Sequence, residues 1–129
     1  MLKKFLIIAA ILGAASVLLG AFGAHILKGL LNADTFQTFE TAVRYQFYHV
    51  FALLAAAVLF QQFPGKYLVW SCRFFIAGIV LFSGSLYLLT YFLSQGNTNM
   101  NWLGIVTPFG GISFIAGWIF IVLAVFKKR

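Results

Sequence analysis

The stretch Phe39–Leu54, FETAVRYQFYHVFALL, decides the fold class of this chain. Its first half mixes charged and aromatic side chains, and from Val50 to Phe60 every residue is apolar. A surface helix of a water-soluble protein would keep a polar face along its whole length. The stretch therefore predicts a membrane helix, and its polar beginning needs a specific structural or functional reason.

The composition extends this conclusion to the whole chain. The chain has 129 residues, enough for one domain. Of these residues 63% are hydrophobic and 9% are charged, and the mean hydropathy is +1.00. Soluble domains carry about 25% charged residues. Nine basic residues against two acids give a net charge of +7. The bases lie at the ends of apolar runs and form no basic face, so they indicate membrane orientation and no nucleic-acid partner.

Four apolar runs separated by short polar connectors predict an all-α, four-helix transmembrane bundle in a single membrane domain, residues 1–129. The first run, residues 5–22, is about 18 residues long, which exceeds the apolar part of most signal peptides, so we expect it to stay as a helix. The single cysteine, Cys72, excludes an internal disulfide. The expected helices cover residues 5–24, 35–63, 67–93 and 109–126.

Caps and helix breakers set the predicted ends of the second helix. Asp34 followed by Gln37 predicts its N-terminus, and Pro64–Gly65 predicts its end. A helix over residues 35–63 would be about 43 Å long, against a hydrocarbon core of about 30 Å. Its first turns should therefore extend into the membrane interface.

Two further signals concern the first and last helices. Residues 25–32 predict a connector after the first helix. Pro108 is well placed in the first turn of a helix with Thr107 as its cap, so the continuous fourth helix is expected to start at Phe109.

The basic residues predict the orientation. With four crossings, the N-terminus, the turn at residues 61–66 and the C-terminus share one side of the membrane. The other side holds two bases, Lys28 and Arg44. The positive-inside rule then places both termini in the cytoplasm and the protein in the cell (cytoplasmic or inner) membrane. The first side holds seven bases: Lys3, Lys4, Lys66, Arg73, Lys127, Lys128 and Arg129.

Small residues recur on the helices and predict close helix packing, because lipid supplies no hydrophobic drive between helices. Their number also suggests partners, either a second copy of the chain or a larger membrane complex, besides membrane lipids. The predicted packing positions are Ser16, Gly20, Ala24, Gly78, Gly84, Gly110, Ser113 and Gly117.

Glu40 and Arg44 are the first candidates for a functional site. They lie four residues apart with the acid first, which is the favourable order for a helical ion pair. Arg44 falls about one turn inside the expected hydrocarbon boundary, where a basic side chain is costly. The pair has three interpretations: it fixes the helix end, it binds an anionic lipid or small ligand, or it takes part in catalysis.

His49 lies deeper on the same helix, with Tyr45 one turn before it, and His25 lies at the outer end of the first helix. Two membrane histidines have three interpretations. They can ligate a haem or metal, relay protons, or hydrogen-bond a neighbouring helix. The sequence has no histidine pair at four-residue spacing, which disfavours the metal site.

Catalytic signatures do not stand out in the sequence. It contains no phosphate-binding glycine loop, zinc spacing or paired buried carboxylates, and we expect no cofactor. The leading interpretation is a non-catalytic accessory, packing or lipid-binding membrane component. The alternatives are a small transporter or channel component with a polar vestibule at Glu40, Arg44 and His49, and a bis-histidine haem or metal protein.

Five short motifs occur in order along the chain. They are GAFGAH at residues 20–25, ETAVRYQ at 40–46 with His49, LFSGSLY at 81–87, TPFGG at 107–111 and AGW at 116–118. Together they resemble the small bacterial membrane protein family of unknown function whose animal relatives include transmembrane protein 256. The resemblance covers essentially the whole chain and implies four membrane helices and an uncleaved first segment, but no activity, substrate or catalytic residue.

The orientation can be tested with reporters fused after Arg129. A reporter that works only in the cytoplasm should be active there, because the seven bases hold both termini on the inner side. Activity of a reporter that works only outside the membrane would contradict the predicted orientation.

Overall fold

The computed structural model describes residues 2–127, so Lys128 and Arg129, two of the bases used to predict the orientation, lie outside the described residues. Within residues 2–127 the chain is helical and forms no strand. Four continuous helical rods are long and apolar enough to cross a membrane. The predicted all-α, four-helix transmembrane bundle is therefore confirmed.

Two of the rods are interrupted by a π-helical turn, and the other two are single helices. The first rod joins α1 (Lys3–Phe22), η1 (Gly23–Leu27) and α2 (Lys28–Leu30), and the second is α3 (Ala33–Leu59). The third joins α4 (Lys66–Gly78), η2 (Ile79–Ser83) and α5 (Gly84–Ser94), and the fourth is α6 (Leu103–Phe126).

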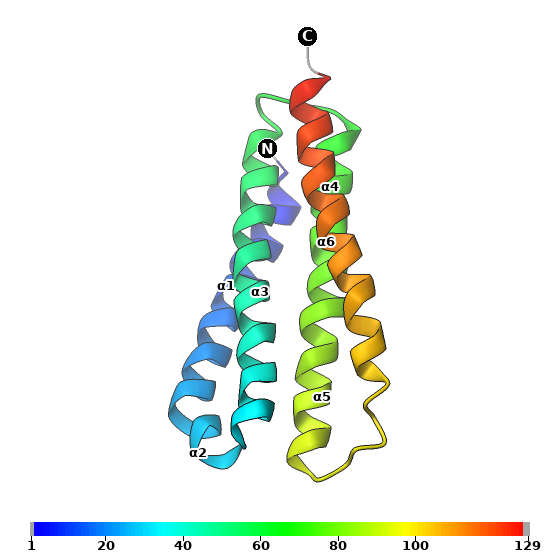
Figure 1. Ribbon diagram of the computed structural model, residues 1–129. Coiled ribbons are helices and arrows are strands. Elements are labelled where there is room, and N and C mark those ends of the chain that lie inside the picture. The colour runs from blue at the N-terminus through cyan, green and yellow to red at the C-terminus, as the bar shows by residue number, and fades with distance from the viewer. Residues whose placement is uncertain (1, 128–129) are drawn as a thin grey trace.

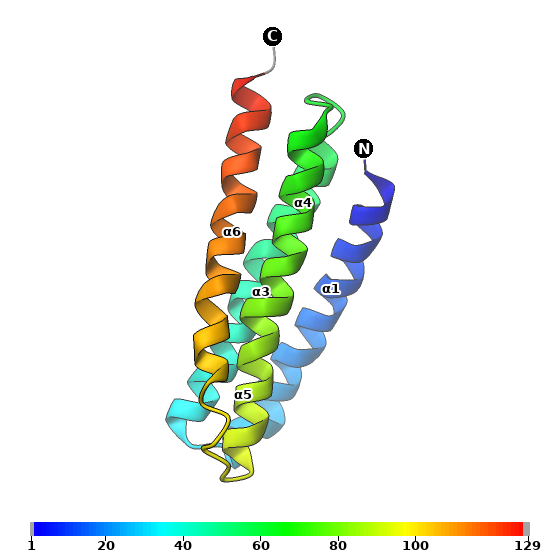
Figure 2. The same cartoon turned by 90° about the vertical axis from the view of Figure 1, so that its right-hand side faces the viewer.

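The rods pack in two pairs. α1 lies against α3, and the α4–α5 rod lies against α6 (Figures 1 and 2). α3 also packs on α4, η2 and α5, so it joins the two pairs. The N-terminal end of α1, the α3–α4 turn and the C-terminal end of α6 lie at one end of the bundle (Figure 1). α2 and the loop from α5 to α6 lie at the other end.

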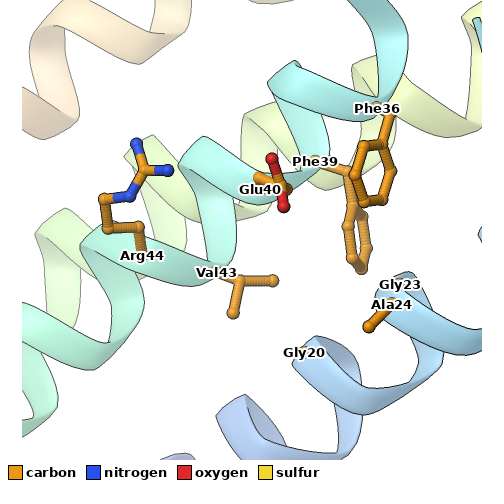
Figure 3. A pocket seen from close by; sticks show the side chains of 8 residues that line it. All are labelled: Gly20, Gly23, Ala24, Phe36, Phe39, Glu40, Val43 and Arg44. Carbon is orange, nitrogen blue, oxygen red and sulfur yellow. The ribbon is translucent and has the colours of Figure 1, made fainter. Parts of the chain in front are cut away.

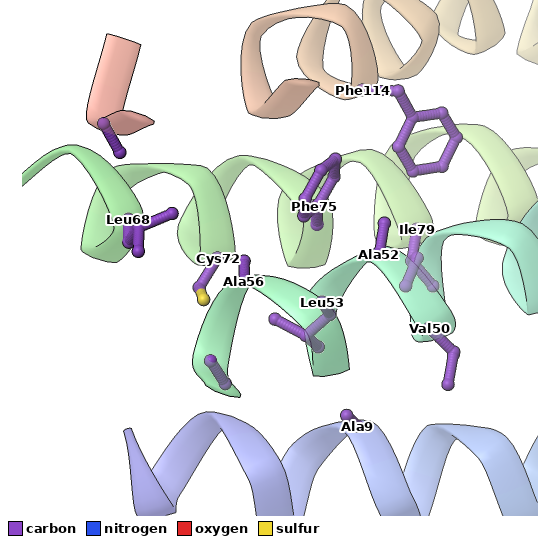
Figure 4. Close-up of a cluster of buried hydrophobic side chains, with 12 residues drawn as sticks. Ala9, Val50, Ala52, Leu53, Ala56, Leu68, Cys72, Phe75, Ile79 and Phe114 are labelled. Carbon is purple, nitrogen blue, oxygen red and sulfur yellow. The ribbon is translucent and has the colours of Figure 1, made fainter. Parts of the chain in front are cut away.

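The apolar core lies between α3 and α4, with Ala9 of α1 on one side and Phe114 of α6 on the other (Figure 4). Phe75, Leu53, Leu68 and Cys72 are fully buried there. Small side chains of α3, such as Ala56, let the neighbouring helix approach. Many large apolar side chains on the outer surface are exposed instead, as expected for a protein surrounded by lipid.

The first rod is longer than predicted. Residues 25–30 continue the helix through η1 and α2, so the connector predicted over residues 25–32 is wrong over most of its length. Neither Lys28 nor Gly29 is a strong enough breaker to end a helix that has already formed. The π-helical turn lies where the Phe39 ring sits against Gly23, and a Cβ at Gly23 would overlap that ring.

The ends of α3 also differ from the prediction. Asn32, and not Asp34, is the N-cap, and its side-chain oxygen accepts a hydrogen bond from the Thr35 amide at 2.8 Å. Asp34 lies in the first turn, where an acid favours the positive end of the helix dipole. The helix ends at Leu59 instead of residue 63, and residues 60–62 form a turn before Pro64.

The fourth helix begins six residues earlier than predicted. α6 starts at Leu103 and contains Pro108, so Thr107 is no cap and Phe109 is not the first residue. A proline this close to the helix start removes the single hydrogen bond that its amide would give to the carbonyl of Gly104. The Thr107 hydroxyl instead lies 2.7 Å from the Ser85 hydroxyl and 3.3 Å from the Leu103 carbonyl oxygen.

The predicted packing positions differ in how close their neighbours come. An added Cβ would overlap Phe114 at Gly78, the Phe82 backbone at Gly110 and Phe75 at Gly117. Gly20 has room for a Cβ, with Val43 at 3.7 Å, and Gly84 has only a backbone oxygen at 4.0 Å. Ser16 and Ser113 are buried, and Ala24 is exposed.

Replacing Gly110→Ala should destabilise the bundle by about 1–3 kcal/mol, the usual cost of overpacking, because the new methyl group meets backbone and not a flexible side chain. Gly111→Ala is the matched control, since its Cβ would meet nothing within 4 Å. Its stability should change by less than about 0.5 kcal/mol. Unfolding in detergent micelles measures both, and equal losses would contradict the close approach of α6 to η2.

Candidate functional site

α3 presents polar residues on two different faces. Glu40 and Arg44 are one turn apart, as are Tyr45 and His49, and successive residues are about 100° apart around a helix. The first pair faces the groove between α3 and α1. The second pair faces η2 and α6. The predicted vestibule with Glu40, Arg44 and His49 on one cavity is therefore not formed.

His49 is buried, with 6% of its surface exposed. Its Nδ1 lies 2.9 Å from the Tyr45 carbonyl oxygen, and its Nε2 lies 3.2 Å from Nε1 of Trp118. A carbonyl accepts, so Nδ1 must carry the proton, and the Trp118 N–H donates, so Nε2 must present its lone pair. Only the neutral Nδ1–H form of His49 satisfies both contacts.

The His49 ring is also packed among aromatic side chains of α4 and α6. It stacks on Phe114 with ring centroids 3.5 Å apart and planes 8° apart. Phe75 lies 5.7 Å away, and Trp118 meets it edge-on at 6.0 Å. His49 therefore fastens α3 to α6 by one hydrogen bond and one stacked ring. This arrangement favours the interhelical interpretation of His49.

His25 does not meet His49. It is exposed in η1, next to the turn where Gly23 contacts Phe39, and Phe39 is ten residues or about 15 Å of helix from His49. The two imidazoles therefore cannot bind one iron. Among residues 2–127 no group of three or more His, Cys, Asp or Glu side chains is placed to hold a metal ion. His49 has no free lone pair for one, because Trp118 occupies Nε2.

A second polar contact in the membrane interior involves Gln46, a residue outside the candidates named from the sequence. Its Nε2 donates to the Leu12 carbonyl oxygen of α1 at 3.1 Å, and its Oε1 accepts from the Tyr87 hydroxyl of α5 at 2.7 Å. Gln46 thus joins α1, α3 and α5. The signal for it is present in the sequence, since a glutamine inside an apolar helix needs a partner on another helix.

Serine hydroxyls donate further hydrogen bonds between rods. Ser71 of α4 donates to the Gly117 carbonyl oxygen of α6, and Ser113 of α6 donates to the Phe74 carbonyl oxygen of α4, both at 2.7 Å. Ser83 donates to the Ala42 carbonyl oxygen of α3 at 2.7 Å. Within residues 2–127, every buried side-chain nitrogen and oxygen atom has a hydrogen-bond partner. The interior therefore presents no unsatisfied polar group to a substrate.

The groove between α1 and α3 is a different kind of surface. It has a volume of about 210 Å³ and is open on one side. Phe39 and Val43 point toward the small residues Gly20 and Gly23 of α1, and the Arg44 guanidinium projects away from α1 (Figure 3). Its floor is thus apolar and its rim is charged.

The two charged residues on the rim, Glu40 and Arg44, are exposed. No ion pair forms between them in the part of the chain that the structure describes, although each is within one turn of the other. The interpretation that a Glu40–Arg44 ion pair fixes the helix end is therefore not supported, and both charges are exposed.

Comparison with known proteins is consistent with this architecture. The family described as "Protein of unknown function (DUF423)" matches residues 19–111, which is most of the chain. The chain belongs to this family. Two similar relatives are the Bacillus subtilis UPF0382 membrane protein YwdK, 42% identical, and the Escherichia coli K12 UPF0382 inner membrane protein YgdD, 38% identical. Each alignment spans 127 residues and 98% of this chain, with 98% of YwdK and 92% of YgdD.

The relatives of this DUF423 protein extend to other bacteria. A Staphylococcus aureus UPF0382 membrane protein, SAB0533, is 39% identical over 98% of both chains. No solved structure matches the chain. The resemblance inferred from the motifs is thus confirmed, and the DUF423 protein is a multi-pass protein of the cytoplasmic membrane.

Replacing His49→Ala should lower the stability of the bundle by about 2–5 kcal/mol, as for other large core truncations, because it removes the ring between Phe114 and Trp118. His25→Ala is the control, and since that side chain is exposed its effect should stay within about 0.5 kcal/mol. Thermal unfolding in micelles measures both. A His49→Ala protein as stable as wild type would contradict the fastening role.

Proposed function

We propose that this protein is a non-catalytic membrane component that holds a phospholipid headgroup at the groove between α1 and α3. The observation that carries the proposal is the contrast between the two polar faces of α3. The buried face is fully satisfied by hydrogen bonds within the protein, whereas Glu40 and Arg44 on the groove do not pair with each other.

The depth of Arg44 supports a lipid partner. α3 has 27 residues and is about 40 Å long, roughly 10 Å longer than the hydrocarbon core. Its apolar end is at Leu59, so the excess lies at the N-terminal end, which puts Glu40 near the boundary and Arg44 one turn inside. A basic side chain there is costly unless it reaches an anion or the interface.

The direction of the Arg44 side chain brings it toward the anions of the headgroup layer. Side chains of a helix tilt toward its N-terminus, and the N-terminus of α3 lies at the surface end of the rod. Arg44 therefore leans toward the headgroup layer, where lipid phosphates lie. An arginine binds a phosphate through two parallel hydrogen bonds, which suits it to this task.

The size of the groove supports binding of part of a lipid, not an enclosed substrate. Its volume of about 210 Å³ is below the range of roughly 300–1,000 Å³ typical of small-molecule sites. Its apolar floor suits the upper part of an acyl chain, and its charged rim suits a headgroup. Catalysis is not included in the proposal, because no nucleophile and base converge on the groove among its lining residues.

Replacing Arg44→Gln should lower the amount of phospholipid that stays on the purified protein by about three- to fivefold, the effect of losing one partly exposed charge contact. Native mass spectrometry from mild detergent measures the bound lipid and, in the same spectrum, any oligomer or co-purified subunit. The control is Lys28→Gln, the other base at the same end, which is exposed and does not line the groove, and it should keep the wild-type amount of lipid. Equal lipid retention in wild type and Arg44→Gln would contradict the proposal.

A further inference from the structure

We propose that the groove selects a headgroup with a primary ammonium, as in phosphatidylethanolamine, with Arg44 on the phosphate and Glu40 on the ammonium. This inference rests on the proposed function, because it assigns the headgroup class of the same groove. It adds a role for Glu40 that phosphate binding alone does not require.

The order of the two charges along the membrane normal matches that headgroup. Glu40 lies four residues closer to the N-terminus of α3 than Arg44, or about 6 Å nearer the membrane surface. In phosphatidylethanolamine the phosphate is attached on the lipid side and the ammonium follows it outward through a two-carbon linker. With the headgroup in this outward order, the lipid phosphate would contact Arg44 and the lipid ammonium would contact Glu40.

The Glu40 carboxylate is available to bind the ammonium of the lipid. Glu40 lines the groove and forms no ion pair with Arg44 among the described residues. A primary ammonium donates hydrogen bonds to a carboxylate, and such charge-assisted bonds are stronger than neutral ones. The quaternary ammonium of phosphatidylcholine has no N–H to donate, and the glycerol of phosphatidylglycerol has no positive charge.

The charge balance at this end of the bundle favours a headgroup without net charge. Both acids of the chain, Asp34 and Glu40, lie here with two bases, Lys28 and Arg44. The opposite end has no acid to offset its bases. Anionic lipids are therefore drawn to that opposite end, whereas a zwitterion suits the balanced end. The bases of the opposite end within the described residues are Lys3, Lys4, Lys66, Arg73 and Lys127.

The experiment compares three lipids on the full-length protein in nanodiscs that contain equal amounts of phosphatidylethanolamine, phosphatidylcholine and phosphatidylglycerol. Lipids that remain bound after release into the gas phase are counted by native mass spectrometry. Lipid at the groove is measured as the lipid that the wild-type protein retains and Arg44→Gln loses. Within it, phosphatidylethanolamine should exceed each of the other two lipids at least about threefold, the size expected of one partly exposed charged contact. Glu40→Gln should abolish this preference and still bind lipid through Arg44.

Asp34→Asn is the matched control, because it removes the other acid of the chain, which does not line the groove. It should keep the preference for phosphatidylethanolamine. The selectivity is overturned if Glu40→Gln keeps the preference for phosphatidylethanolamine, or if Asp34→Asn loses this preference as well. It is also overturned if the wild-type protein binds the three lipids equally at the groove and Arg44→Gln lowers the binding of all three, a result that leaves the headgroup site itself intact. Lipid binding that Arg44→Gln does not change would overturn the headgroup site as well. Both acids are exposed, so a size-exclusion profile like that of the wild type establishes that each variant is folded.

Discussion

The bilayer interior offers no water, so every polar group placed there needs a partner within the protein or among the lipids. The structure meets this constraint residue by residue. Gln46 reaches α1 and α5, His49 reaches α6, and three serines donate to carbonyl oxygens of neighbouring rods. These bonds, more than apolar contact, define which helix lies beside which, because lipid tails compete equally for apolar side chains.

Close approach of the backbones makes these bonds possible. A serine hydroxyl is short, and it reaches a carbonyl on the next helix only when the two helices nearly touch. The pair of bonds between α4 and α6 lies beside Gly117, and a Cβ at that residue would overlap Phe75. Gly110 has the same role two turns earlier in α6, where the helix meets the Phe82 backbone. Small residues and serines therefore act together where α6 meets the α4–α5 rod.

The two faces of α3 have different roles: one face stabilises the bundle, and the other carries the proposed binding site. Tyr45 and His49 face an aromatic cluster, and His49 links α3 to α6 through its stacking on Phe114 and its hydrogen bond with Trp118. Arg44 is only one residue before Tyr45, yet it lies with Glu40 on an open groove. One helix thus fastens the bundle on one side and offers charges on the other. We propose ligand binding on the side with Glu40 and Arg44, because among the described residues these two charges do not pair with each other.

The sequence by itself determined the membrane class, the number of crossings and the approximate place of the four helices, because apolar runs of sufficient length have no other stable arrangement. It also showed that Glu40, Arg44 and His49 needed explanation. Only the tertiary structure decided that His49 has a partner on another helix and that Glu40 and Arg44, among the described residues, do not pair with each other. The spacing along a helix gives the face on which a residue lies, but not which helix covers that face, and so His49 met Trp118, 69 residues later, while His25 stayed exposed. The structure also showed that α6 starts before Pro108 and that the first rod continues past Ala24, because a proline near a helix start removes only one hydrogen bond and Lys28 and Gly29 are weak helix breakers.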